Sequence, residues 1–364
     1  MNSTLRRVGV ALAAPLLAIA IAVVLTSIVL LALGNSVGPV WQVFLSSPMP
    51  GVTEAIINDT AVLYLSGVAV AIGFRMNLFN IGVDGQYRVA AFAAALFAAQ
   101  GWLPGFLNVI FALLLAMLVG AVWAGIIAVL KVTRGVSEVI SSIMLNSIAT
   151  GVVAWLLNKV ADRTPGSNAT VTKSIPDSSH VPALANLSGG PIYGLGILAV
   201  IVGLVYWFVI NRTRFGFDLR ATGTSESAAV ASGVNVKRMT ISAMLMSGAV
   251  AGLVGMPQLF GQDYNYGSNS QSGLGFAGIA VALIGRNNPI GIAFGALLWA
   301  YLNGQSDALQ INAGVNASLV NIIQGVMVLA VVIAYELVRR WDKSIEQRHV
   351  AAELAAGNIA GASA

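Results

Sequence analysis

The chain has 364 residues, of which 57% are hydrophobic and only 9% are charged, with a formal net charge of +5. A typical soluble domain has about 25% charged residues, so this composition excludes a pair of soluble domains and predicts a polytopic inner-membrane protein. There is no cysteine and there are only two histidines, which excludes a disulfide framework and a thiolate metal site. We expect no metal ion and no cofactor to be bound by this chain.

The first apolar run, residues 8–33, follows Arg6 and Arg7. It is longer than the ~7–15 residues of a signal-peptide core and lacks a clear small-x-small cleavage site, so we interpret it as a retained first span. A helix needs roughly 20 mainly apolar residues to cross a bilayer, and hydropathy on this basis predicts an all-α transmembrane bundle of about ten spans. They run near residues 9–33, 56–74, 86–101, 105–130, 138–158, 192–210, 239–260, 273–286, 289–306 and 317–338.

The basic residues favour this count of spans. With a cytoplasmic N-terminus, ten spans place only Lys159, Arg163 and Lys173 outside and the other Lys and Arg residues inside, as the positive-inside rule requires. Both termini are therefore predicted to be cytoplasmic. The positive charge is a topology signal and does not indicate nucleic-acid binding. The third and eighth spans are short, and they are either full crossings or broken, re-entrant helices.

The predicted domain organisation is simple. Residues 1–344 form one transmembrane domain, and residues 345–364, where charged residues give way to Ala and Gly, form a flexible cytoplasmic tail. The outside loop 159–190 is rich in Pro, Ser, Asn and Thr. It is either a solvated connector or a docking surface for an extracytoplasmic partner.

Polar residues interrupt the apolar sequence after the second span, at residues 74–86. This segment is either a cytoplasmic turn or a broken helix beside a translocation path, in which Asn80 and Gln86 would offer hydrogen bonds to a neutral solute. Asp84, like the other acidic residues, maps near a membrane surface. In the fifth span Glu138 stands at the helix N-terminus, and the deeper Asn146 either bonds across helices or lines the path. The candidate pathway residues are Asn77, Asn80, Asp84, Gln86, Asn146 and Phe276.

Several glycines in the later spans occur at spacings that allow helices to approach closely. Gly248 and Gly252 show the small-xxx-small spacing of packed membrane helices, and Pro257 follows them as an expected kink. Residues 273–285 are also rich in glycine. Packing is the expected role of these residues.

The basic segment 211–238 predicts a short helix outside the membrane. Thr222 or Thr224 would cap it, Glu226 would meet the helix dipole, and Gly233 would end it. Its side chains are small, so it could fit closely in the groove of another protein. The alternative is an ordinary basic loop. The chain has no GxxxxGK[ST] motif, so any nucleotide that drives transport binds elsewhere.

Taken together, these segments resemble the permease subunits of bacterial ATP-binding-cassette importers. The chain is similar to the branched-chain amino acid/ribose permease superfamily, and most similar to its nucleoside and simple-sugar branch. Two positions depart from the family pattern, since Asp84 stands where Glu is more common and Ser225 where Asn is common. The resemblance rests on FNIGVDGQ (79–86), SEVISSIMLN (137–146), LRATGTSESAAVASGVNV (219–236) and GFAGIAVALIG (275–285).

The resemblance implies a non-enzymatic transport subunit that works with three partners. A cytoplasmic ATPase, which binds ATP and magnesium, would dock on segment 219–236 as the coupling segment. A second related permease, different or identical, would complete the path, and an extracytoplasmic lipoprotein would deliver the solute. The expected solute is a nucleoside. The alternatives are a simple-sugar permease and an ion-coupled secondary transporter. Weak similarity between residues 78–105 and 271–295 suggests inverted repeats. The implied coupling residues are Arg220, Gly223, Ser225, Glu226, Ala228, Ala229 and Gly233.

Overall fold

A computed structural model describes residues 3–162, 169–187, 190–267, 272–316 and 318–362. Parts of the predicted outside loop and the last two residues of the predicted tail lie outside these ranges. The chain divides into two compact units, one formed by Met1–Ser47 with Ser306–Ala364 and the other by Pro48–Gln305. Each unit is described by itself.

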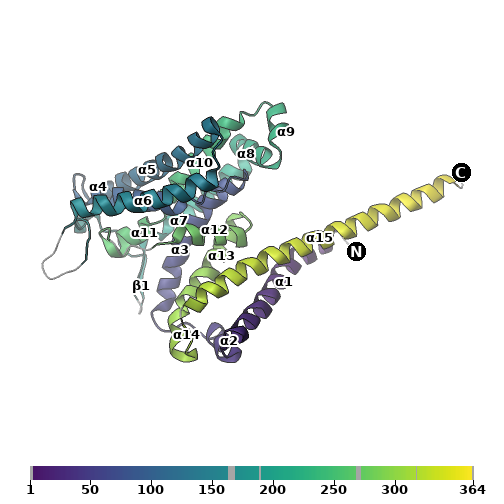
Figure 1. Ribbon diagram of the computed structural model, residues 1–364, viewed down its shortest axis with the longest axis horizontal. Helices are drawn as coiled ribbons and strands as arrows, with labels where there is room; N and C mark the ends of the chain where they lie inside the picture. Colours follow the sequence, from purple (N-terminus) through teal and green to yellow (C-terminus); the bar gives the residue numbers. More distant parts are fainter. Residues whose placement is uncertain (1–2, 163–168, 188–189, 268–271, 317, 363–364) are drawn as a thin grey trace. The chain divides into compact units, whose positions relative to one another are not determined.

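The first unit is built from helices at the two ends of the chain. It contains α1 (Ser3–Ala32), α2 (Val37–Leu45), α14 (Ser306–Ala313) and α15 (Ser318–Ala362). α1 packs along α15, and α14 packs on α2 (Figure 1). α15 continues without a break from the tenth predicted span through most of the residues that we assigned to the tail.

The second unit carries the remaining helices and one small hairpin. Its helical order begins with α3 (Val52–Phe74), α4 (Val83–Ala99), α5 (Gly105–Arg134) and α6 (Glu138–Val160). The predicted outside loop comes next, with η1 (Asp177–Ser179), the antiparallel pair β1 (Ala185–Leu187) and β2 (Gly190–Ile192), and η2 (Gly194–Gly196). The order then continues with α7 (Ile197–Arg212), α8 (Arg214–Thr224), α9 (Glu226–Ala231), α10 (Val236–Gly252), α11 (Met256–Gln258), the π-helix η3 (Leu259–Asp263), α12 (Leu274–Ile284) and α13 (Pro289–Gly304).

Every predicted span overlaps at least one helix, but the seventh is divided among α10, α11 and η3, and the helices differ in length. Within the described ranges, six helical segments are long and apolar enough to cross a membrane. α4 has 17 residues, α13 has 16 and α12 has only 11. At 1.5 Å per residue α12 is about 16 Å long, roughly half the thickness of a hydrocarbon core. α12 is therefore too short to be a full crossing.

Small residues hold α5 against α10. A Cβ added at Gly252 would meet the carbonyl of Ala116, and one added at Gly248 would meet that of Gly120, so only glycine allows this approach. The predicted packing role of Gly248 and Gly252 is confirmed. α10 ends at Gly252, and the chain turns before Pro257, which lies in the short helix α11. The break falls just ahead of the expected kink.

The outer face of α5 is apolar. The exposed side chains recur every three to four residues, as expected for one face of a helix, and a helix face of this kind suits contact with lipid tails. Together with the six long apolar helices, it shows a multi-pass membrane protein. The exposed residues include Phe111, Leu114, Leu118 and Val122.

Candidate functional site

Two helices of the second unit begin inside the bundle. The hydroxyl of Ser66 in α3 donates to the carbonyl of Leu274 at 2.7 Å, and the backbone N–H of Gly275 donates to the carboxylate of Asp84 at 3.3 Å. Ser66 lies eight residues before the end of α3, about 12 Å along the helix axis. The chain therefore folds back after Phe74, and both α4 and α12 start beside the middle of α3.

This geometry corrects the predicted position of Asp84. We expected Asp84 near a membrane surface, but it lies 5% exposed in the bundle, beside the middle of α3. Its carboxylate pairs with Arg88 one turn along α4, at 3.0 Å between Oδ2 and Nε. The sequence pattern could not reveal this position, because residues 75–82 return into the bundle before α4 begins. The ion pair makes the region formally neutral.

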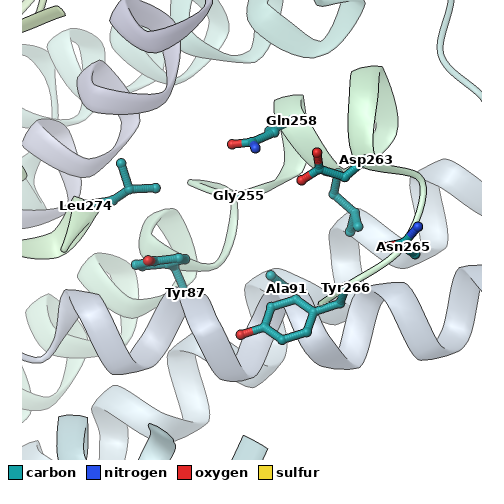
Figure 2. Close-up of a pocket in the computed structure, with 9 residues that line it drawn as sticks. Tyr87, Ala91, Gly255, Gln258, Asp263, Asn265, Tyr266 and Leu274 are labelled. Atoms are coloured by element: carbon teal, nitrogen blue, oxygen red, sulfur yellow. The ribbon is translucent and has the colours of Figure 1, made fainter. Parts of the chain in front are cut away.

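A small pocket, with a cavity volume of about 30 Å³, opens beside the start of α4. Figure 2 shows Tyr87, Ala91 and Tyr266 along one side of it and Gln258 and Asp263 on the other. Leu274, the first residue of α12, and Gly255 also line it. The pocket thus combines two phenol rings with amide and carboxylate groups, and such a set can contact a flat ring and bond to polar edges.

None of these pocket residues was among our predicted pathway residues. A sequence signal was present, since the polar residue Gln258 lies near the end of the seventh predicted span and Asp263 and Asn265 follow it. Their approach to Tyr87 depends on the fold, because 171 positions separate Gln258 from Tyr87 along the chain. Within the described ranges, no cluster of three or more His, Asp or Glu side chains could hold a metal ion.

The predicted outside loop supports the wall of the pocket. Thr172 and Tyr266 exchange two hydrogen bonds: the Tyr266 N–H donates to the Thr172 hydroxyl at 3.0 Å, and the Thr172 N–H donates to the Tyr266 carbonyl at 2.8 Å. The His180 ring stacks on Tyr264 at 3.6 Å, and the Tyr266 ring meets Phe92 edge-on. Burial raises the pKa of the Tyr266 phenol. The described part of the loop is therefore packed onto residues 264–267.

Three of the predicted pathway amides bond to the protein itself. Asn80 donates to Gln86 at 3.0 Å and to Ser247 at 2.8 Å, and Gln86 donates back to Asn80 at 2.9 Å. Asn146 accepts from the Gly85 N–H at 2.9 Å and donates to the Ile81 carbonyl at 3.0 Å. These bonds hold the returning segment in place. Whether the amides also meet a solute stays a prediction.

The other two predicted pathway residues lie elsewhere. The Asn77 amide donates to the Gly223 carbonyl at 2.6 Å, which places it on the predicted coupling segment. Phe276 is 52% exposed on α12. Neither lines the pocket. Glu138 does lie in the first turn of α6, as predicted, and it pairs with Lys131 at 2.6 Å.

The predicted coupling segment forms two helices instead of one. Thr222 and Thr224 donate to carbonyls of α8, because α8 runs through Thr224, and so neither caps the next helix. The cap is Ser225, whose hydroxyl accepts from the Ala228 N–H at 3.3 Å. Gly233, with a φ of +83°, follows the end of α9 as predicted.

The two faces of α9 differ in exposure. Ala229 is 2% exposed and faces the protein, whereas Val230 is 60% exposed and Glu226 and Ala228 are also exposed. On the neighbouring α8, Arg220 bonds to the carbonyl of Ile210 at the end of α7. Figure 1 shows α8 and α9 at one end of the second unit and β1 toward the other. The segment thus presents small side chains on an open face.

The chain is similar to known transport proteins over most of its length. Residues 52–332 match the family described as "Branched-chain amino acid transport system / permease component". The guanosine ABC transporter permease protein NupP of Bacillus subtilis is 32% identical over 89% of this chain and 93% of its own. The nucleoside ABC transporter permease protein NupB of Lactococcus lactis is 29% identical over 92% and 93%. The glucose ABC transporter permease protein TsgB13 of Haloferax volcanii is 30% identical over 77% and 75%.

Proposed function

We propose a function from one premise: the chain belongs to the family of permease components of branched-chain amino acid transport systems. It is accordingly a transport subunit and not an enzyme, as its sequence predicted. The full proposal is a permease of an ATP-binding-cassette importer in the bacterial inner membrane that carries a nucleoside. ATP and magnesium would be bound by a partner ATPase, and this chain would hold no cofactor.

The similarity to two nucleoside permeases carries the nucleoside assignment, and the side chains that line the pocket agree with it. A nucleoside has a flat aromatic base and a neutral, hydroxyl-rich sugar. The rings of Tyr87 and Tyr266 suit the base, while Gln258 and Asp263 suit hydrogen-bond donors of either part. The Asp84–Arg88 pair adds no net charge beside the pocket, so Asp263 is the charged group of the lining. NupP and NupB, the two relatives that match about nine-tenths of this chain, are described as permeases for guanosine and nucleosides.

A simple sugar is the second candidate. The similarity to TsgB13, which is described as a glucose permease, supports it, although that match covers 77% of this chain. A sugar would form hydrogen bonds with Gln258 and Asp263 but would gain less binding energy from the two aromatic rings. This difference separates the two candidates by experiment.

The proposed topology has about ten spans with both termini in the cytoplasm, and the eighth contains a broken helix, because α12 alone covers only about half of the hydrocarbon core. The short α4 and α12 support an inverted-repeat arrangement, because transporters built on such repeats often place the N-termini of broken helices near the solute. Leu274 at the start of α12 and Tyr87 in the first turns of α4 both line the pocket. The predicted similarity between residues 78–105 and 271–295 contains both helix starts.

Three partners complete the proposal. The ATPase would dock on the exposed face of α9, and a second, related permease would form the other half of the path. A solute-binding lipoprotein would dock on the predicted outside loop, which bonds directly to Tyr266 through Thr172. Through that contact, docking of the lipoprotein would displace the pocket wall at Tyr266.

The test is transport by the whole complex. Proteoliposomes that contain this chain, its second permease, its ATPase and its lipoprotein are supplied with labelled guanosine, ribose or glucose. We expect accumulation of guanosine that requires ATP and continues in the presence of an uncoupler. Uptake abolished by the uncoupler and indifferent to ATP would identify a secondary transporter, and sugar uptake alone would identify the sugar branch.

A pair of variants tests the pocket itself. Tyr266→Phe keeps the ring against Phe92, so nucleoside uptake should stay close to that of the unaltered complex. Tyr266→Leu removes the ring, and we expect uptake to fall by about threefold to tenfold, the effect of one aromatic contact worth about 0.5–1.5 kcal/mol. Equal uptake by the two variants would exclude a stacked base at this site.

A further inference from the structure

One arginine links three separate parts of the second unit. Arg75, the first residue after α3, donates from Nη2 to the Asn287 carbonyl at 2.7 Å and from Nε to the Tyr206 hydroxyl at 3.4 Å. The Tyr206 hydroxyl donates to the same Asn287 carbonyl at 2.8 Å. The end of α3 and the middle of α7 are thus joined to the turn between α12 and α13.

The turn that receives these bonds has an unusual backbone. Arg286 and Asn287 have φ values of +53° and +55°, a region that non-glycine residues seldom occupy. Two consecutive residues of this kind reverse the chain tightly after α12, and they aim the Asn287 carbonyl at Arg75. A turn with such a specific backbone transmits a displacement better than a loose loop would.

The coupling segment rests on the residues around Arg75. Asn77 donates to the Gly223 carbonyl at 2.6 Å, and a Cβ at Gly223 would meet the Arg75 carbonyl. Asn77 also has a positive φ, +55°, which directs its amide toward α8. Backbone of the coupling segment therefore touches backbone at Arg75, with no flexible side chain between them.

The far end of α12 reaches the pocket. Leu274 lines the pocket and the Gly275 N–H bonds to Asp84, while the other end of α12 leads into the turn held by Arg75. α12 has 11 residues, so a single short helix connects the turn at Asn287 with the pocket wall. Because a short helix moves as a rigid body, a shift of its C-terminal end, beside Asn287, also displaces its N-terminal end at the pocket.

We propose that Arg75 is a positioning residue that couples segment 219–236 to α12. Movement of α8 passes through Gly223 and Asn77 to Arg75, and from Arg75 to the Asn287 carbonyl and α12. The planar guanidinium suits this role because it holds two partners in a fixed geometry. The inference rests on the proposed function, since it needs an ATPase that moves the coupling segment.

The first test compares Arg75→Gln with Arg134→Gln in the reconstituted complex. Arg134 is exposed at the end of α5, so the control removes one positive charge without touching the link. We expect Arg75→Gln to retain ATP hydrolysis while solute uptake per ATP falls at least about fivefold, the lower range of coupling factors between sites. Unchanged uptake per ATP in Arg75→Gln would overturn the proposal.

Asn77→Gly tests the same link from the other side. Glycine keeps the positive φ at no steric cost but removes the bond to Gly223, so it stays informative if Arg75→Gln fails to fold. We expect a smaller loss of uptake per ATP than in Arg75→Gln, with normal insertion and stability. A ratio equal to that of the unaltered complex would count against transmission through Asn77.

Spin labels separate failure of this proposal from failure of the proposed function. The chain has no cysteine, so Phe276→Cys on α12 and Leu118→Cys on α5, both exposed, give two unique label sites. ATP should change the distance between the labels with Arg75 present and leave it unchanged in Arg75→Gln, whatever the solute is. The same ATP response in both proteins would overturn the proposal, and a complex that moves its labels but imports no solute would instead overturn the assigned solute.

Discussion

The backbone N–H of Gly275 donates to the carboxylate of Asp84 at 3.3 Å across 191 positions of sequence. This bond joins the first turns of α12 and α4. Both helices direct the positive ends of their dipoles to this point, and a carboxylate there neutralises part of that charge. Asp84 supplies this carboxylate, and Arg88 balances its charge.

Asp84→Asn should destabilise the protein strongly. The amide keeps an acceptor for Gly275 but leaves Arg88 without its counter-ion in a mostly buried site, which costs about 3–5 kcal/mol for a buried pair. Thermal unfolding in detergent measures the loss. Asp84→Asn combined with Arg88→Gln should recover much of it, and a double variant no more stable than Asp84→Asn would show that the ion pair is not the cause.

Asn80→Leu separates a structural role from a pathway role. The change leaves Gln86 with a buried, unpaired amide, and the free energy of unfolding should fall by about 1–3 kcal/mol. Phe79→Leu is the neighbouring control, since Phe79 is 49% exposed and its replacement stays apolar. Full stability combined with lost solute uptake would instead assign Asn80 to the translocation path.

The two alanines of α9 should respond differently to a bulky residue. Ala228→Trp adds its ring on the exposed face, so the protein should fold normally but lose ATPase in co-purification. Ala229→Trp adds the ring at a site that is 2% exposed, where overpacking costs about 1–3 kcal/mol, and should lower the melting temperature. Retention of the ATPase by Ala228→Trp would place the docking surface elsewhere.

Thr172→Val should loosen the pocket wall. Valine has the shape of threonine but cannot accept from the Tyr266 N–H, so amide hydrogen exchange at residues 264–267 should accelerate about fivefold to tenfold for a bond worth about 1 kcal/mol. Thr172→Ser keeps the hydroxyl and is the matched control. Identical exchange in both variants would mean that the loop does not support Tyr266.

Hydropathy and charge were sufficient to predict the helices of the bundle. The predicted spans all overlap helices, although the seventh is broken after Gly252. The spacing of Gly248 and Gly252 predicted close helix packing, because apolar runs and close packing leave local patterns in the sequence. The short helix of the coupling segment was also predictable from a local pattern, since its small residues and the glycine that ends it lie close together in the sequence. The predicted cap of this helix was wrong, since Ser225 caps it and not Thr222 or Thr224. No local signal showed that α8 would extend through Thr224.

The placement of Asp84 and the composition of the pocket depended on the tertiary structure alone. We predicted Asp84 near a membrane surface because it follows a polar segment. Only the return of residues 75–82 into the bundle places it beside Ser66. Tyr87 and Gln258 line the same pocket because the fold brings the segment after α10 to α4. Composition and periodicity describe how each helix meets its surroundings, but they carry no information about which distant helix supplies the opposite wall.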